Sequence, residues 1–71
     1  MENNKIIFYI TVWLWDHYYS SYEPYIQLET ESEEEVREAF NKIIPSVDCP
    51  QVDLNKRDGE KIELIEVKEA A

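Results

Sequence analysis

The sequence contains few of the residues from which most catalytic and metal sites are built. Its 71 residues include one histidine, one cysteine and one glycine. Transition-metal sites usually need several histidine or cysteine ligands, and phosphate-binding loops need several glycines. His17 follows Asp16 directly, but neighbouring residues of a strand point to opposite faces, and a single histidine with Cys49 is a poor basis for a catalytic dyad. We therefore expect no enzyme activity, no cofactor and no metal site.

The scarcity of cysteine also bears on the cellular compartment. Cys49 has no partner in the chain for a disulfide, and a secreted domain of this size usually carries several disulfides. The N-terminal segment resembles a signal peptide only superficially, because Glu2 offsets Lys5 and no small-residue cleavage site follows. Its apolar run is also too short to span a membrane as a helix. We expect a cytoplasmic protein without a membrane segment.

Basic residues are scarce as well. Seven lysines and arginines stand against sixteen aspartates and glutamates, which gives a net charge of −9. Affinity for nucleic acid depends mostly on lysine and arginine, so direct binding to nucleic acid or to an anionic membrane is not expected. The negative field favours a basic protein partner instead. The alternative is that the charge serves only solubility.

One long hydrophobic run is present, Ile6–Trp15, and it predicts a β-strand. Its even positions are all apolar, whereas its odd positions include Tyr9, Trp13 and Trp15. A single helix can cover only one side of a sheet, so the second face of this strand is predicted to be a contact surface. A chain this short buries only about 60% of its unfolded surface, so such a contact would add to a marginal stability.

A polar, aromatic connection follows and ends at Pro24, which is expected to interrupt regular strand pairing. Tyr25–Thr30 alternates between apolar and polar residues and predicts a second strand. The two strands are expected to form a hairpin with a long tip. Ile26 and Leu28 are assigned to the core side, because a shift of one residue would bury polar neighbours.

Ser32–Ile44 predicts an amphipathic helix that ends before Pro45. Ser32 and Glu35 have the spacing of a capping box, in which each side chain accepts a hydrogen bond from the other residue's backbone N–H. The predicted apolar stripe consists of Val36, Ala39, Phe40 and Ile43.

The last third of the chain predicts a short strand at Gln51–Asn55, a turn at Lys56–Gly59 and a final strand at Lys61–Val67. The final strand has Ile62 and Leu64 on one face and Ile65 and Val67 on the other. Apolar residues on both faces favour a place in the middle of the sheet, next to the first strand.

The whole chain, 1–71, is thus predicted to be a single α+β domain of order ββαββ. It has a mostly antiparallel four-stranded sheet and one amphipathic helix packed on one face. Residues 1–4 and 68–71 are expected to fray. The predicted core comprises Ile6, Phe8, Ile10, Val12, Leu14, Ile26, Leu28, Val36, Ala39, Phe40, Ile43, Val52, Leu54, Ile62 and Leu64.

Aromatic residues gather around the first hairpin. Tyrosine and tryptophan dominate the energetic centres of protein interfaces, since they offer a large rigid surface with a polar tip. The aromatic candidates for partner binding are Tyr9, Trp13, Trp15, Tyr18 and Tyr19. The alternative is that these rings cover one another and close a small second core.

Glutamates crowd residues 29–38, where six of the ten positions are glutamate and the only base is Arg37. A row of carboxylates on a rigid helix resembles the phosphates of a duplex, and the candidates for such a row are Glu31, Glu34 and Glu38. The alternative is a solvated helix face whose acids complement the helix dipole.

These observations lead to two functional hypotheses. The first is a small acidic inhibitor that binds a basic protein, such as a nuclease or a nucleic-acid-binding complex, and blocks its site. Phage-encoded inhibitors, including anti-CRISPR proteins and other DNA mimics, share this general type, although no motif identifies a family. The second is a structural homodimer or larger homo-oligomer that packs through Tyr9, Thr11, Trp13 and Ile65. A small-molecule site among the tyrosines is a third alternative.

Overall fold

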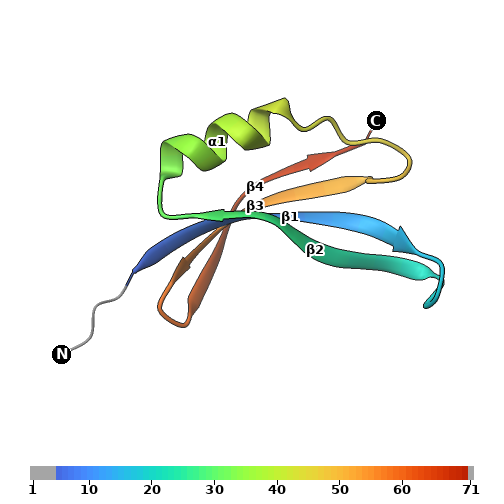
Figure 1. Cartoon of the computed structure of the whole chain (residues 1–71), viewed down its shortest axis with the longest axis horizontal. Helices are drawn as coiled ribbons and strands as arrows, with labels where there is room; N and C mark the ends of the chain where they lie inside the picture. The colour runs from blue at the N-terminus through green and yellow to red at the C-terminus, as the bar shows by residue number, and fades with distance from the viewer. Residues whose placement is uncertain (1–4, 71) are drawn as a thin grey trace.

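The computed structural model describes residues 5–70, which form four strands and one helix (Figure 1). The strands are all antiparallel to their neighbours, in the order β2-β1-β3-β4. The predicted α+β class and the ββαββ order are therefore confirmed. The elements are β1 (Ile6–Asp16), β2 (Ser21–Thr30), α1 (Glu33–Lys42), β3 (Gln51–Asp58) and β4 (Lys61–Glu69).

The predicted fraying is only partly addressed by the structure. Residues 1–4 and Ala71 lie outside the described residues. Lys68 and Glu69 were expected to fray, but they belong to β4, which extends to Glu69.

Strand β1 is central, as its two apolar faces indicate. It pairs with β2 on one side and with β3 on the other. Its even-numbered residues Phe8, Ile10 and Val12 are buried and face α1, whereas Ile6 and Leu14 at the two ends are more than a third exposed. The even face is thus the core face only over the middle of the strand, because one short helix does not reach both ends.

Helix α1 begins as the capping pattern predicts, with one change. The Glu35 backbone N–H donates to Ser32 Oγ at 3.1 Å. The reciprocal bond runs through a third residue: the Ser32 N–H donates to Thr30 Oγ1 at 3.1 Å, and the Thr30 hydroxyl donates to Glu35 Oε1 at 2.8 Å. This relay connects the end of β2 to the first turn of the helix.

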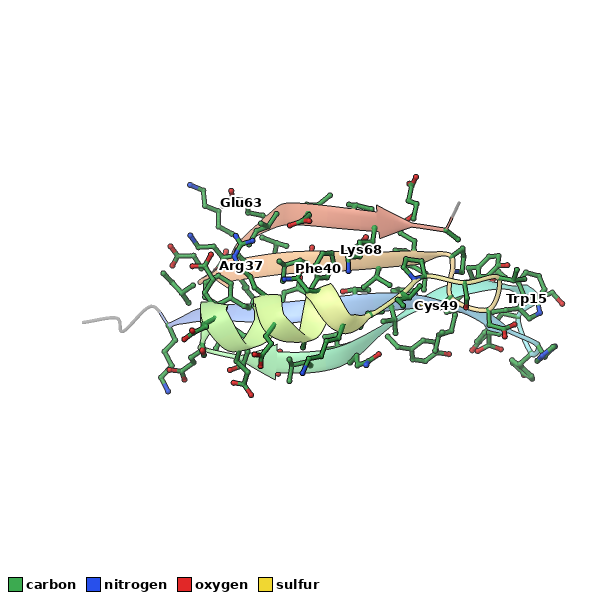
Figure 2. The ribbon with its side chains drawn as sticks, turned by 90° about the horizontal axis from the view of Figure 1, so that it is seen from above. Trp15, Arg37, Phe40, Cys49, Glu63 and Lys68 are labelled. Carbon is green, nitrogen blue, oxygen red and sulfur yellow. The ribbon has the colours of Figure 1, made fainter. Side chains whose placement is uncertain are left out.

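The other end of α1 is held by a residue that the sequence analysis did not single out. Lys68 of β4 donates from Nζ to the Phe40 carbonyl at 2.7 Å and to the Ile43 carbonyl at 3.1 Å. Its ammonium group also lies 4.8 Å from the centre of the Phe40 ring, and Figure 2 shows the two side chains close together. A cation at a helix C-terminus satisfies free carbonyls and complements the dipole. Lys68 therefore ties the edge strand β4 to the helix.

Strand β2 is longer than predicted and includes Pro24. It starts at Ser21, and Pro24 pairs with Trp13 of β1. The proline is tolerated because β2 is an edge strand, whose outer side needs no N–H donor. The connection to β1 is correspondingly short, since only residues 17–20 form the turn and Ser20 has a positive φ of 54°.

Two irregularities in strand register reverse several of the predicted side-chain directions. In β2, Leu28 pairs with Ile10 but Ile26 pairs with Thr11, so Ile26 lies on the opposite face of the sheet from Leu28. In β4, Leu64 pairs with Asn55 across a second irregularity, and Ile65 packs against the core. A strict period of two, on which the sequence assignment was based, does not continue through a bulge.

The C-terminal hairpin also differs from the prediction. Strand β3 runs to Asp58, so Lys56, Arg57 and Asp58 are paired, and the turn is Gly59-Glu60. Gly59 has a φ of 67°, which suits glycine at the first position of a two-residue hairpin turn. The neighbour of β1 is β3, whereas β4 lies at the sheet edge. A short turn obliges β4 to pair with β3, and β3 already occupies the free side of β1.

The buried core is smaller than predicted. Five of the predicted residues are wrong, because Ile6, Leu14, Ile26, Ile62 and Leu64 are between 36% and 63% exposed. Leu28, Ala39, Ile43, Cys49 and Ile65 are partly buried around the core. The buried apolar residues are Phe8, Ile10, Val12, Val36, Phe40, Val52 and Leu54.

The helix covers only part of its side of the sheet. Ten residues make a helix about 15 Å long, whereas the molecule extends 44 Å along its longest axis. Figure 1 shows the β1–β2 hairpin projecting beyond α1. Within residues 5–70, no helix is long and apolar enough to cross a membrane.

Candidate functional site

The side of the sheet opposite α1 carries no helix among the described residues (Figure 1). Residues that pair across strands share a face, so the register assigns side chains to this side. We call it the open face. Its residues are Ile7, Tyr9, Thr11, Trp13 and Trp15 of β1, Tyr22, Pro24, Ile26 and Glu29 of β2, Gln51, Asp53, Asn55 and Arg57 of β3, and Ile62, Leu64, Val67 and Glu69 of β4.

The open face exposes large apolar side chains at its margins. Ile26 is 57% exposed, and Ile62 and Leu64 are 63% and 56% exposed. Trp15, Tyr22 and Val67 are each about two-fifths exposed. Exposed apolar residues gathered on one face of a monomer are typical of an interaction surface.

A row of polar side chains runs through the middle of the open face. Asn55 donates from Nδ2 to Thr11 Oγ1 at 3.1 Å. Trp13 donates from Nε1 to Asp53 Oδ2 at 3.0 Å, and Gln51 donates from Nε2 to Asp53 Oδ1 at 2.9 Å. Thr11, Asp53 and Asn55 are buried although no helix covers them. The polar tip of Trp13 is thus used inside the protein, while its ring remains half-buried on the surface.

Tyr9, another candidate, belongs to a charged group on the same face. The Arg57 guanidinium lies 5.9 Å from the centre of the Tyr9 ring and 3.6 Å from Glu29 Oε2. The two charges offset one another, so this part of the open face carries little net charge.

The tip of the β1–β2 hairpin holds Tyr18 and Tyr19, and both are more exposed than the other aromatic candidates, at 86% and 66%. Their rings meet edge to face at 4.9 Å, and Trp15 meets Tyr22 in the same manner at 5.0 Å. These pairs cover part of their own surface, as the second-core alternative expected. They leave most of Tyr18 and Tyr19 free to contact another molecule.

The Asp16 carboxylate accepts three hydrogen bonds from residues at and near this tip. Its Oδ1 accepts the backbone N–H groups of Tyr18 at 2.8 Å and Tyr19 at 3.2 Å, and its Oδ2 accepts the Tyr25 hydroxyl at 3.1 Å. The Tyr19 backbone N–H is the main cause of a pKa of Asp16 below the ordinary value of 3.8, with help from Tyr25 and Tyr18. The same contact raises the pKa of Tyr25 above 10.0, because the Asp16 carboxylate favours the neutral phenol.

Most of the clustered glutamates form an ion pair or a hydrogen bond with a nearby side chain. Glu29 lies near Arg57, and Glu31 lies 3.7 Å from Lys5 Nζ. Glu33 is 2.9 Å from Arg37 Nε. Neither Glu34 nor Glu38 forms an ion pair with another residue of the range 5–70. Both are exposed on the side of α1 opposite the buried Val36 and Phe40.

The structure therefore separates the candidates that the sequence placed in one site. Tyr9, Trp13 and Trp15 lie on the open face, and Tyr18 and Tyr19 lie at the tip beyond it. The three acids Glu31, Glu34 and Glu38 lie on and just before α1, on the helix side of the sheet. A flat partner cannot contact both sets at once.

Several open-face residues were missed at the sequence level. Ile26, Ile62 and Leu64 were assigned to the core, and Ile65 was assigned to the face that packs in a homo-oligomer, which is wrong because Ile65 contacts the core. The available signal was the pair Leu64-Ile65, two adjacent large apolar residues in an otherwise alternating strand. Such a break in alternation is what a bulge produces.

The described residues contain no cluster of three or more histidine, cysteine, aspartate or glutamate side chains that could hold a metal ion. Cys49 is a free thiol, half-buried beside the core, and its Sγ lies 3.7 Å from the Gln51 carbonyl oxygen.

Comparison with known proteins does not place the chain in a group. No protein-family model, no curated protein and no solved structure matches it.

Proposed function

We propose that this protein is a small acidic inhibitor that binds a basic protein and blocks a site made for nucleic acid. The observation that carries the proposal is the pair Glu34 and Glu38, one helical turn apart on the exposed side of α1. Within the described residues neither carboxylate is neutralised. Both ends of the helix are tied to the sheet, by the Thr30 hydroxyl that donates to Glu35 and by the Lys68 ammonium that donates to the Phe40 carbonyl, so the charges are held on a rigid element.

The net charge of −9 supports the same proposal, because it attracts a basic surface over a distance and repels the nucleic acid that competes for it. The free thiol of Cys49 fits the reducing cytoplasm, where we place the protein and where such a target would be met.

The test compares two triple variants with the same net charge. E31Q/E34Q/E38Q neutralises the candidate acids, whereas E60Q/E63Q/E69Q removes three exposed carboxylates from the β3–β4 hairpin. Binding to a panel of purified nucleases and DNA-binding proteins is measured at low and high salt, with duplex DNA as a competitor.

We expect the first variant to lose binding and the second to keep most of it. Duplex DNA and the unmodified protein should compete for the same site on the basic partner. Equal losses of partner binding in both variants would mean that only the net charge of the protein matters. Binding that is insensitive to salt would contradict the imitation of phosphates altogether.

A second candidate function is a structural homo-oligomer that packs through the open face. The observation that favours it is the exposure of Ile26, Ile62 and Leu64 on a sheet side without a helix. Packing two such sheets face to face would bury these side chains and add stability to a short chain.

Sedimentation at micromolar concentration tests this candidate. The homo-oligomer requires that the unmodified protein sediment as a dimer or larger species and that Ile62→Lys sediment as a monomer. Ile44→Lys is the matched control, because Ile44 is 84% exposed and lies in the loop after α1, outside the strands. A monomeric unmodified protein would eliminate the homo-oligomer. If Trp13→Ala then also left partner binding unchanged, the open face would have no role in contact.

A further inference from the structure

A shallow groove of about 460 Å³ lies between the β1–β2 hairpin and the loop that follows α1. It is separate from the acidic side of the helix: Figure 2 shows Trp15 at one end of the molecule and Arg37 and Glu63 near the other. Its lining residues are Leu14, Trp15, His17, Tyr22, Val47 and Asp48.

Two aromatic rings form one wall of this groove. Trp15 and Tyr22 pack edge to face at 5.0 Å, and each remains 43% exposed. Leu14 and Val47 add apolar surface, and Val47 is 85% exposed although it is a β-branched apolar residue. The lining therefore offers ring faces and aliphatic contacts that the fold itself leaves uncovered.

The hairpin and the loop contain acidic residues but no lysine or arginine, since neither the stretch 6–36 nor the stretch 43–55 includes one. Their one histidine, His17, lines the groove. Asp16 is committed to the tip through three hydrogen bonds, and Glu23 accepts the Ser21 hydroxyl at 2.6 Å. Asp48 lines the groove and makes no side-chain hydrogen bond or ion pair within residues 5–70.

We propose that this groove binds an arginine side chain of the basic partner. The guanidinium group stacks against the ring face of Trp15 or Tyr22 and pairs with the Asp48 carboxylate, while the methylene groups contact Leu14 and Val47. This inference rests on the proposed function, since it specifies how a basic protein is recognised. It adds a second contact region, away from Glu34 and Glu38, so a partner that contacts both regions must curve around the molecule.

Arginine fits this lining better than other side chains do. A planar guanidinium stacks on aromatic rings and donates hydrogen bonds to a carboxylate at the same time, whereas a lysine ammonium is more strongly hydrated. An apolar side chain would leave Asp48 without a partner, and an acidic one would be repelled by it.

The experiment is an NMR titration of the intact protein with the amide of Gly-Arg-Gly, with the amides of Gly-Lys-Gly and Gly-Glu-Gly as charge controls. Moderate salt suppresses non-specific attraction to the acidic chain. We expect saturable shifts of the Trp15 indole and of the Tyr22, Val47 and Asp48 amides with the arginine peptide. The lysine peptide should bind more weakly, and the glutamate peptide should give no shift.

Variants separate the groove from the rest of the surface. Trp15→Ala should weaken arginine binding about tenfold, through loss of the stacking surface. Asp48→Asn, which preserves the shape of the groove, should weaken it about threefold. Ile44→Ala and Glu60→Gln are matched controls, because Ile44 and Glu60 are exposed and lie outside the lining, and both should bind as the unmodified protein does. Unchanged resonances of Ile10 and Leu54 verify that each variant is folded.

The inference is overturned if the arginine peptide shifts only residues of α1, if the lysine peptide binds equally well, or if Asp48→Asn has no effect. Shifts confined to α1 would contradict arginine binding in the groove but would leave the proposal about the acidic helix intact. The opposite result is also distinguishable. If the arginine peptide binds the groove but the two triple glutamine variants lose partner binding equally, only the proposal about the acidic helix is contradicted.

Discussion

The two faces of the sheet are built from the same strands but are completed differently. On the helix side, Phe8, Ile10 and Leu54 are buried beneath Val36 and Phe40 of α1. On the open face, a hydrogen-bonded polar row occupies the centre, and apolar side chains are exposed at the margins. Burial in this small chain therefore depends on which part of the sheet the ten residues of α1 cover. Apolar residues beyond that reach are left for another molecule.

The largest difference between the faces is expected from truncating one large side chain on each. Phe40→Ala removes a ring that is 1% exposed, and we expect a loss of about 3–5 kcal/mol in the free energy of unfolding. Leu64→Ala on the open face should cost less than about 1 kcal/mol, because Leu64 is already 56% exposed. Urea denaturation measures both. Similar losses would mean that the open face is covered in solution, which would favour the homo-oligomer.

The second prediction concerns the tie between the edge strand and the helix. Lys68→Met keeps the aliphatic stem but removes the donors to the Phe40 and Ile43 carbonyls. We expect a loss of about 1.5–3 kcal/mol, the range for hydrogen bonds to charged groups. Lys61→Met on the same strand is the control, since Lys61 is exposed and forms no side-chain hydrogen bond or ion pair within residues 5–70. Equal effects of the two variants would show that Lys68 acts only through its charge.

The third prediction tests the polar row of the open face. Trp13→Phe retains an aromatic ring but removes the N–H that donates to Asp53. We expect a loss of about 1–2 kcal/mol by thermal or chemical denaturation, because a buried carboxylate loses one of its two donors. Trp15→Phe should change stability by a few tenths of a kcal/mol, since the Trp15 indole N–H makes no hydrogen bond within the described residues. A larger effect at Trp15 than at Trp13 would contradict the role of the row.

The smallest effect concerns pH at the hairpin tip. The pKa of Asp16 is lowered in the folded protein, so its carboxylate adds stability above the ordinary value of 3.8 and loses that contribution as the pH falls through the lowered value. The amide resonances of Tyr18 and Tyr19, followed by NMR during acidification, should therefore titrate with a midpoint below 3.8. A control titration of Asp16→Asn should lose this transition. A midpoint at or above 3.8 would mean that these bonds do not hold the tip in solution.

Much of the fold could be predicted because the local sequence patterns agree with the secondary structure that the tertiary fold contains. The bounds of β1, the N-cap at Ser32 and the apolar stripe of α1 follow from strand alternation, capping chemistry and helical periodicity. The order of the strands was less accessible. A strand with apolar residues on both faces could be central or could be an edge strand with an exposed face, and β4 is the latter.

The candidate site divides in the same manner. Sequence identified Tyr9, Trp13 and Trp15 as residues of a face without a helix, because alternation along β1 distinguishes its two sides. It could not reveal that Glu31, Glu34 and Glu38 lie on the other side of the sheet, or that Lys5 and Arg57 offset neighbouring glutamates. Those relations depend on which strands meet across the sheet.

Local sequence patterns are enough to specify the class of the fold, the helix and its cap, the central strand with two unlike faces, and a strongly negative charge. Each of these follows from residues close together in the chain. Long-range contacts are needed to establish that bulges in β2 and β4 expose Ile26 and bury part of Ile65, that Lys68 caps the end of the helix, and that the hairpin and the loop after α1 border a groove. A bulge changes side-chain direction by one residue, and its position depends on the partner strand, which the local sequence of a strand does not specify.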